Sequence, residues 1–154
     1  MMKKVQWMIF VLLLAAVVGC KNAPKEQNQI ALTGHEWELK TMTKADSVVK
    51  NPEQLPTLLF SDSTAVYGSA GCNRFFGTYS VEKGGKMTLK PGGSTMMYCP
   101  DMAFEDAYLK ALAEVKEYAI QGKELKLTDG NGKLVLLYGV VDAASKGSVR
   151  DTLK

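Results

Sequence analysis

The sequence predicts an α+β domain in which a small antiparallel β-sheet of about 7–8 strands packs on one α-helix. Several short segments alternate apolar and polar residues and are separated by turns rich in glycine, asparagine and aspartate, as half-buried strands are. One segment, residues 100–115, instead repeats its apolar residues at helical spacing. A single amphipathic helix among strands is expected to lie across the sheet and cover its apolar face.

The strands follow from alternation and from turn residues. Trp37 and Leu39 alternate with charged neighbours and are expected to face inward on the first strand. The polar segment 43–56 contains Pro52 and Pro56 and is expected to be a loop. The predicted strands are 36–41, 57–60, 64–70, 75–81, 86–90, 118–121, 124–127 and 133–138.

A sharp bend is predicted before the fourth strand. Gly71 and Asn73 flank Cys72, and both residue types tolerate positive φ. The residues expected on the inward face of the following strand are Phe75, Gly77, Tyr79 and Val81. Gly77 within that face indicates a bulge or a close approach of another chain segment. A turn with a core strand explains the pattern, and a binding site is the alternative.

The helix is expected to begin after a break. Residues 91–94 (Pro-Gly-Gly-Ser) interrupt regular structure, and Pro100 suits the first helical position. Asp101, Glu105 and Asp106 stand at the head of the helix, where surface carboxylates match the helix dipole. Paired catalytic carboxylates are the less favoured interpretation.

The last part of the domain is predicted to be a hairpin and a central strand. Gly122-Lys123 is typical of a type II′ turn, and residues 129–132 form a second turn. Residues 133–138 are apolar on both faces, which indicates a covered strand. The domain is expected to span residues 30–138, and residues 139–154 to be a loose tail.

The N-terminus is predicted to be a secretion signal. Lys3 and Lys4 precede an apolar run at residues 5–18, which is shorter than the roughly 20 residues that a membrane-spanning helix needs. Residues 17–20, Val-Val-Gly-Cys, resemble the lipobox of bacterial lipoproteins. That resemblance implies cleavage after residue 19 and lipidation of Cys20, and a secreted protein with a chance cysteine is the alternative.

A lipidated Cys20 predicts a location. Two or more acyl chains anchor a protein stably, so the chain is expected on a membrane of the cell envelope. The expected location is the outer membrane, facing the periplasm. Residues 20–29 are polar and without periodicity, as in a tether. Loss of residues 1–19 removes two lysines and lowers the formal net charge from +3 to +1, which gives no basis for a nucleic-acid partner. A monomer is expected.

The remaining cysteines are predicted to pair. An oxidising compartment preserves disulfides, and Cys72 and Cys99 are the cysteines left once Cys20 carries lipid. The bond would tie the bend at Gly71 to the start of the helix. Two separate buried thiols are the alternative.

Several kinds of chemistry are excluded. His35 is the single histidine, which rules out a Ser-His-Asp triad or a histidine-rich metal site in practice, and it is expected at the surface. Residues 129–132 resemble the opening of a calcium loop, but Lys133 and Val140 occupy positions that need oxygen ligands. No cofactor is expected.

One apolar group is ambiguous. Met96, Met97 and Tyr98, together with Phe76, would form an adaptable recognition patch if they were exposed. Burial is the favoured expectation. Arg74 is either a surface charge or a donor to loop carbonyls.

The chain resembles the META domain family over about residues 30–138. The segments that carry the resemblance are 32–39, 56–60, the Gly-Cys-Asn-x-x-x-Gly-x-Tyr core at 71–79, 94–99 and the final apolar strand. The motif positions are Gly71, Cys72, Asn73, Gly77, Tyr79 and Thr95. The resemblance implies a strongly bent sheet wrapped around one helix and no established catalytic residues. It also implies a link to heat shock and drug resistance, and a fold similar to that of secretin-pilot lipoproteins.

The predicted function is that of a non-enzymatic, lipid-anchored envelope protein that binds another protein and contributes to envelope stress tolerance. One alternative is an inhibitor of an envelope hydrolase that inserts residues 43–56 or 91–98 into a cleft. Another is a carrier of a hydrophobic ligand between sheet and helix.

Overall fold

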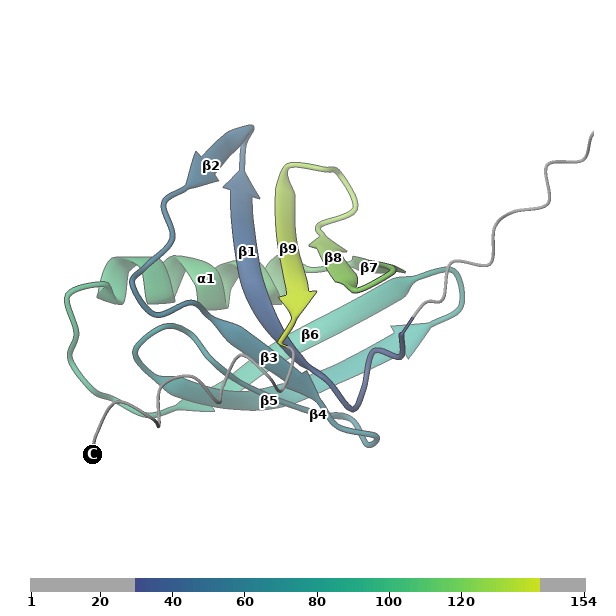
Figure 1. Cartoon of the computed structure of the whole chain (residues 1–154), viewed down its shortest axis with the longest axis horizontal. Coiled ribbons are helices and arrows are strands. Elements are labelled where there is room, and N and C mark those ends of the chain that lie inside the picture. Colours follow the sequence, from purple (N-terminus) through teal and green to yellow (C-terminus); the bar gives the residue numbers. More distant parts are fainter. Residues whose placement is uncertain (1–29, 142–154) are drawn as a thin grey trace, which may run out of the picture.

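The structure is a computed structural model that describes residues 30–141. In this range it contains nine strands and one helix (Figure 1). In chain order they are β1 (Glu36–Lys44), β2 (Ser47–Val49), β3 (Thr57–Phe60), β4 (Ala65–Ser69), β5 (Arg74–Glu82), β6 (Lys86–Ser94), α1 (Met102–Glu114), β7 (Glu117–Gln121), β8 (Glu124–Thr128) and β9 (Leu134–Val140). The predictions for the signal peptide and tether lie outside the described residues, and so does most of the predicted tail. The tail prediction began too early, because Gly139 and Val140 belong to β9.

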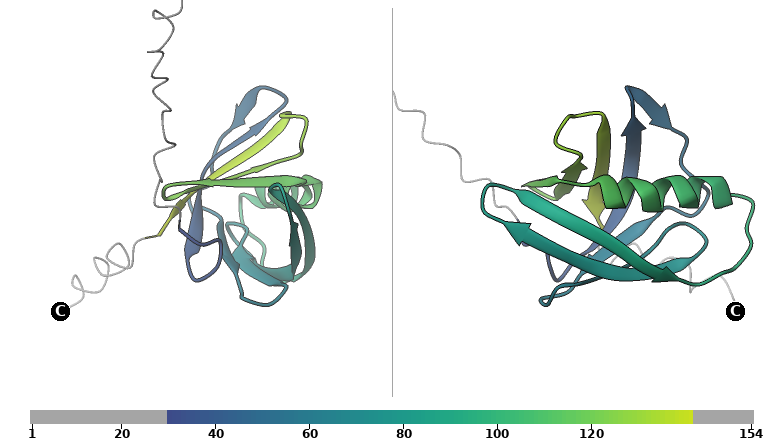
Figure 2. Two further views of the ribbon diagram at one scale, coloured as in Figure 1. Left: turned by 90° about the vertical axis from the view of Figure 1, so that its right-hand side faces the viewer. Right: turned by 180° about the vertical axis from the view of Figure 1, so that it is seen from behind.

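The strands form one antiparallel sheet that curls into a ring. The order is β2-β1-β3-β4-β5-β6-β7-β8-β9, and β1 also pairs with β9. β6 and β7 are joined through a single residue pair, Lys86 with Glu117, so the ring is not a regular barrel. Figure 2 shows α1 lying across the strands, between the β5–β6 hairpin and the β1–β9 pair. The predicted bent sheet around one helix is confirmed.

Two bulges help the sheet to bend. β1 carries one extra residue, Lys40, opposite β9, and β6 carries one extra residue at Gly92-Gly93 opposite β5. An extra residue on one strand increases the local twist. At its first residues β1 also pairs with β3, and at its last residues with β2.

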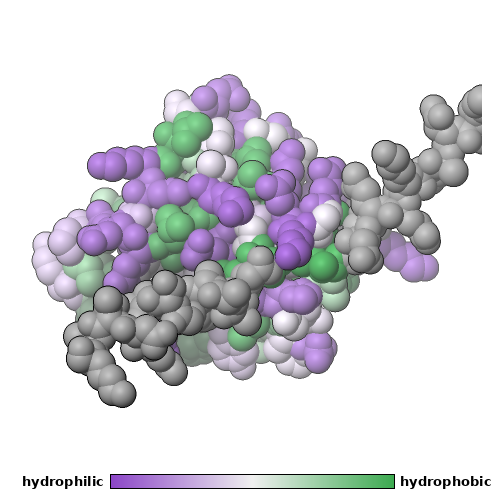
Figure 3. Space-filling model, in the orientation of Figure 1, coloured by the Kyte–Doolittle hydropathy of each residue, from purple (hydrophilic) through white to green (hydrophobic). Residues whose placement is uncertain are grey.

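The core lies between the concave face of the sheet and the helix. Trp37 and Leu39 are fully buried, as their alternation predicts, and Trp37 Nε1 donates to the Leu32 carbonyl at 2.9 Å. Tyr108 on α1 and Tyr138 on β9 are also fully buried, with their hydroxyls 3.0 Å apart. Hydrophilic residues predominate on the face shown in Figure 3, where hydrophobic residues form scattered spots.

Some element boundaries differ from expectation. The predicted loop at 43–56 contains the end of β1 and the short strand β2. β6 continues through 91–94 instead of breaking, because a bulge tolerates proline and glycine. The helix begins at Met102, so Pro100 precedes it. Val81 is 46% exposed, because it lies near the end of β5, where the burial pattern of the strand stops alternating.

The final apolar strand has the central place expected for it. β9 pairs with β1 on one side and with β8 on the other. Among the described residues, no helix is long and apolar enough to cross a membrane.

Candidate functional site

The bend before β5 is a tight corner. Gly71 adopts φ +113°, a conformation that favours glycine, as predicted. Asn73 does not share this positive φ, and it acts through its side chain instead. The corner is closed by the Ala70 N–H, which donates to the Asn73 carbonyl at 2.8 Å.

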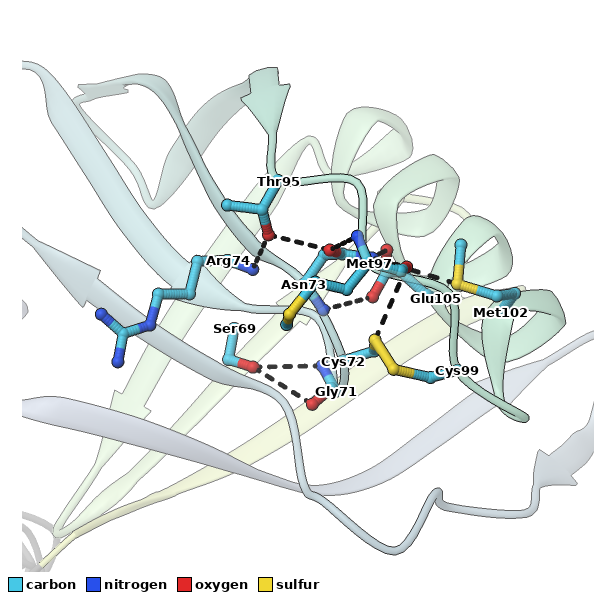
Figure 4. Close-up of a disulfide and its surroundings, with 10 residues drawn as sticks. All are labelled: Ser69, Gly71, Cys72, Asn73, Arg74, Thr95, Met97, Cys99, Met102 and Glu105. Atoms are coloured by element: carbon cyan, nitrogen blue, oxygen red, sulfur yellow. Dashed lines mark hydrogen bonds between the residues drawn. A yellow bond between two sulfur atoms is a disulfide. The ribbon is translucent and has the colours of Figure 1, made fainter.

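Asn73 is the centre of a hydrogen-bond network (Figure 4). Its Oδ1 accepts from Thr95 Oγ1 at 2.8 Å and from the Met97 N–H at 2.7 Å. Its Nδ2 donates to the Met97 carbonyl at 3.0 Å and to Glu105 Oε1 at 2.8 Å. Asn73 is 1% exposed. Its side chain joins the corner, the β6–α1 loop and the helix. Asn73 and Thr95, two of the motif positions, therefore meet in one place.

Glu105 is buried, which corrects the expectation of a surface charge. It is 4% exposed, and its Oε2 accepts from the Asn73 N–H at 2.8 Å. Asp101 and Asp106 are exposed, as expected. Sequence reasoning missed Glu105 because a glutamate in the first helical turn has an ordinary explanation in the helix dipole.

A disulfide joins Cys72 to Cys99, which confirms the predicted pairing. The Cα atoms are 6.2 Å apart. The bond fixes one end of the loop between β6 and α1 to the corner (Figure 4). At the other end, the Thr95 N–H donates to the Arg74 carbonyl at 2.9 Å, and the Arg74 N–H donates to Thr95 Oγ1 at 3.1 Å.

The loop between these two ties presents apolar side chains to solvent. Met96 is 96% exposed, Met97 56% and Tyr98 94%, so the expectation of burial is wrong. The network holds the loop by its backbone, because Met97 bonds to Asn73 through both its N–H and its carbonyl. We call residues 96–98 the display loop.

The other two motif positions lie further along β5 and serve the sheet. A Cβ at Gly77 would overlap the Lys90 carbonyl oxygen and lie 3.0 Å from Pro91 Cα, which explains the glycine as a close approach next to the bulge. Tyr79 donates its hydroxyl to the Ser61 carbonyl at 2.6 Å. Burial, and then the nearby charge of Asp62, raises the pKa of this phenol above its usual value.

An open groove of about 790 Å³ lies on the outer face of the sheet. Leu59, Tyr67 and Phe76 line it and are 42%, 49% and 58% exposed. Arg74 lines the groove near Thr95, and Glu36 lines it on β1. Sequence reasoning placed Phe76 away from the core but could not foresee its neighbours, because strand pairing brings them together.

The described residues contain no cluster of three or more His, Cys, Asp or Glu side chains that could hold a metal. The rings of His35 and Trp37 are in a T-shaped arrangement, with centroids 6.3 Å apart. Asp129 Oδ1 accepts from the Asn131 N–H at 3.0 Å, so the calcium-loop-like sequence is a hairpin turn.

The geometry defines a class: a small domain with a bent antiparallel sheet around one helix, pinned by a disulfide at an asparagine-centred corner. The META domain model matches residues 30–141. The chain therefore belongs to the META domain family, which is not known as catalytic.

Solved structures support the fold. An NMR structure of a protein from Burkholderia xenovorans is 29% identical with a TM-score of 0.61, and the match covers 71% of this chain and 83% of that one. A crystal structure of a DUF4847 family protein from Bacteroides vulgatus is 11% identical with a TM-score of 0.54, over 68% of this chain and 91% of that one, and it shows the fold alone. No curated protein matches.

Proposed function

We propose that this protein is a non-catalytic, lipid-anchored component of the bacterial cell envelope that binds another envelope protein through the display loop. The observation that carries the proposal is the pairing of near-complete exposure with a fixed backbone. Met96 and Tyr98 are 96% and 94% exposed, while Asn73 and the disulfide hold the loop in place. A recognition loop ordered before binding loses less entropy when it binds.

The position of the loop suits a tethered protein. In Figures 1 and 2 the described chain begins beside the β5–β6 hairpin, and the display loop lies at the other end of β6. Cys20 and Ile30 are ten Cα-to-Cα steps apart, a reach of up to about 35 Å when extended. A lipid on Cys20, on the outer membrane facing the periplasm, would thus leave the loop accessible to a partner. A role in envelope stress tolerance rests on the family resemblance.

Photocrosslinking in living cells tests the binding proposal. A photoreactive amino acid replaces Tyr98 in the display loop, and in a matched control it replaces Lys83, which is exposed in the β5–β6 hairpin. We expect a discrete crosslinked protein from position 98 and none from position 83. Equal crosslinking at both positions, or none at 98, contradicts the proposal.

Fractionation tests the anchor. Globomycin, which blocks lipoprotein signal cleavage, should accumulate the precursor, and Cys20→Ala should release the protein from membranes. A fully processed wild-type protein that remains soluble contradicts lipid anchoring.

An inhibitor of an envelope hydrolase is the second candidate. A pinned, projecting loop with apolar tips is suited to insertion into a cleft, which favours residues 91–98 over 43–56 as the inserted segment. Addition of the purified chain to a hydrolase captured from position 98 should lower its activity. If the activity of the hydrolase is unchanged, the protein binds the hydrolase without inhibiting it. The third candidate, a hydrophobic carrier, has less support, because Tyr108 and Leu112 on the inner face of α1 pack into the core with 0% and 1% exposure.

A further inference from the structure

The groove on the outer face of the sheet is built around a row of three side chains. Leu59 on β3 pairs across the strands with Tyr67 on β4, and Tyr67 pairs with Phe76 on β5. All three point away from the core and are about half exposed. Neighbouring strands lie about 4.8 Å apart, so the row spans roughly 10 Å, enough for one or two side chains of a partner.

The Phe76 ring is held in place by the bulge in β6. Phe76 lies where β6 carries its extra residue, and a Cβ at Gly93 would be 2.8 Å from the ring. One side of the ring thus rests on glycine backbone, and the residue remains 58% exposed. A rigid aromatic contact surface loses little entropy on binding.

Arg74 gives one end of the groove a positive charge. It lies two residues before Phe76, on the same outward face of β5, and its backbone is fixed to Thr95. Within residues 30–141 its guanidinium makes no hydrogen bond or ion pair, and it extends away from the Asn73 network (Figure 4). Hydroxyl side chains of Thr57, Ser69 and Thr95 line the same end.

Glu36 lies at the opposite end of the groove. It lies on β1, directly opposite Leu59, and lines the groove on the side away from Arg74. A ligand carboxylate is attracted at Arg74, whose planar fork matches a carboxylate in two hydrogen bonds. The groove therefore has an apolar middle and a single cationic end.

We propose that this groove binds a peptide segment of a partner protein in which an aromatic or large aliphatic residue lies next to a carboxylate. The apolar side chain packs on Tyr67 and Phe76, and the carboxylate pairs with Arg74. A peptide fits better than a neutral saccharide because it supplies both an apolar side chain for the middle of the groove and a carboxylate for Arg74. Arg74 is hydrogen-bonded to Thr95, which lies beside the display loop, so the groove extends the proposed binding surface. The inference therefore rests on the proposed function.

Selection from a random heptapeptide library displayed on phage tests the inference. The full chain is immobilised in detergent, and the best enriched peptide is synthesised and its dissociation constant measured. We expect enriched peptides to combine Phe, Trp, Tyr or Leu with Asp or Glu. Arg74→Gln and Tyr67→Ser should each weaken binding about tenfold or more. Lys83→Gln removes the same charge outside the groove and should leave binding unchanged.

The outcomes separate this inference from the proposed function. Peptides without an acidic residue, or equal binding by wild type and Arg74→Gln, overturn the groove inference. So does Arg74-dependent binding of soluble peptidoglycan fragments without peptide enrichment, which assigns the groove to a saccharide. The double variant Met96→Ser/Tyr98→Ser should still bind the peptide. If it does so while position 98 gives no crosslinked protein in cells, the groove inference is retained and the binding role of the display loop is rejected.

Discussion

Asn73 and Glu105 are joined by two hydrogen bonds of 2.8 Å, one from the backbone N–H of Asn73 and one from its side-chain Nδ2. The residues are 32 positions apart, and both are buried. This contact fixes the helix to the corner from which β5 starts. The same asparagine holds the display loop, so the position of the loop depends on the helix.

Glu105→Ala should therefore destabilise the domain more than the substitution of an exposed acidic residue in a helix usually does. The substitution leaves the Asn73 N–H buried without its acceptor and opens a small cavity, and we expect a loss of about 2–4 kcal/mol of unfolding free energy. Asp106→Ala removes an exposed neighbour with the same charge and should change stability by no more than about 0.5 kcal/mol. Urea unfolding of both variants measures the difference, and equal midpoints would contradict the structural role of Glu105.

The disulfide should contribute a separate share of stability. It closes a loop between residues 27 apart in sequence, for which loop-closure entropy gives about 3–4 kcal/mol. Cys72→Ala/Cys99→Ala should lower the unfolding free energy by about that amount. Hydrogen exchange at the Met97 N–H should also quicken, since the loop loses one of its ties. Unfolding curves that coincide with and without reductant would refute this contribution.

Sequence periodicity was enough to predict most of the sheet. Trp37, Leu39 and Tyr79 lie inward because side chains alternate across a strand, and this rule needs no knowledge of the partner strand. The disulfide could be predicted because residues 17–20 indicate both export to an oxidising compartment and lipidation of Cys20. Two cysteines then remain to pair.

The site itself was harder to predict, because its contacts join distant segments. Nothing near Glu105 in the sequence indicates that the Asn73 N–H lies against it. The exposure of Met96 and Tyr98 was also missed, since apolar residues usually indicate burial. The disulfide and the backbone hydrogen bonds at Thr95 and Met97 hold them outside. The row of Leu59, Tyr67 and Phe76 depends on strand register, which single-strand patterns do not specify.

Gly77→Ala tests the close approach of β5 to β6. A methyl group there would overlap the Lys90 carbonyl oxygen, which belongs to backbone and cannot move aside cheaply. We expect a loss of about 1–3 kcal/mol. Ser80→Ala on the exposed face of the same strand serves as the control, with a change within about 0.5 kcal/mol. Thermal or urea unfolding measures both, and an unaffected Gly77→Ala would show that the strands can separate without loss.

The buried pair Tyr108 and Tyr138 predicts a loss of stability in alkali. Burial raises the pKa of both phenols above 10.0, and the neighbouring Tyr108 raises that of Tyr138 further. Above about pH 10 the unfolded chain therefore releases phenolic protons that the folded chain retains. The folded state then binds more protons, so stability falls as pH rises, by up to about 1.4 kcal/mol per pH unit for each tyrosine. Below about pH 9 the pair should contribute no pH dependence.

Tyr108→Phe separates this effect from other alkaline titrations. The variant removes one of the two buried phenols, so the fall in unfolding free energy above about pH 10 should be shallower than in wild type by about 1.4 kcal/mol per pH unit. Its stability at neutral pH should be lower, because the Tyr138 hydroxyl loses its partner at 3.0 Å. Urea unfolding at a series of pH values measures both changes. Parallel pH profiles for the two proteins would mean that the phenols ionise as readily in the folded state as in the unfolded chain, and that the interior between α1 and β9 admits water.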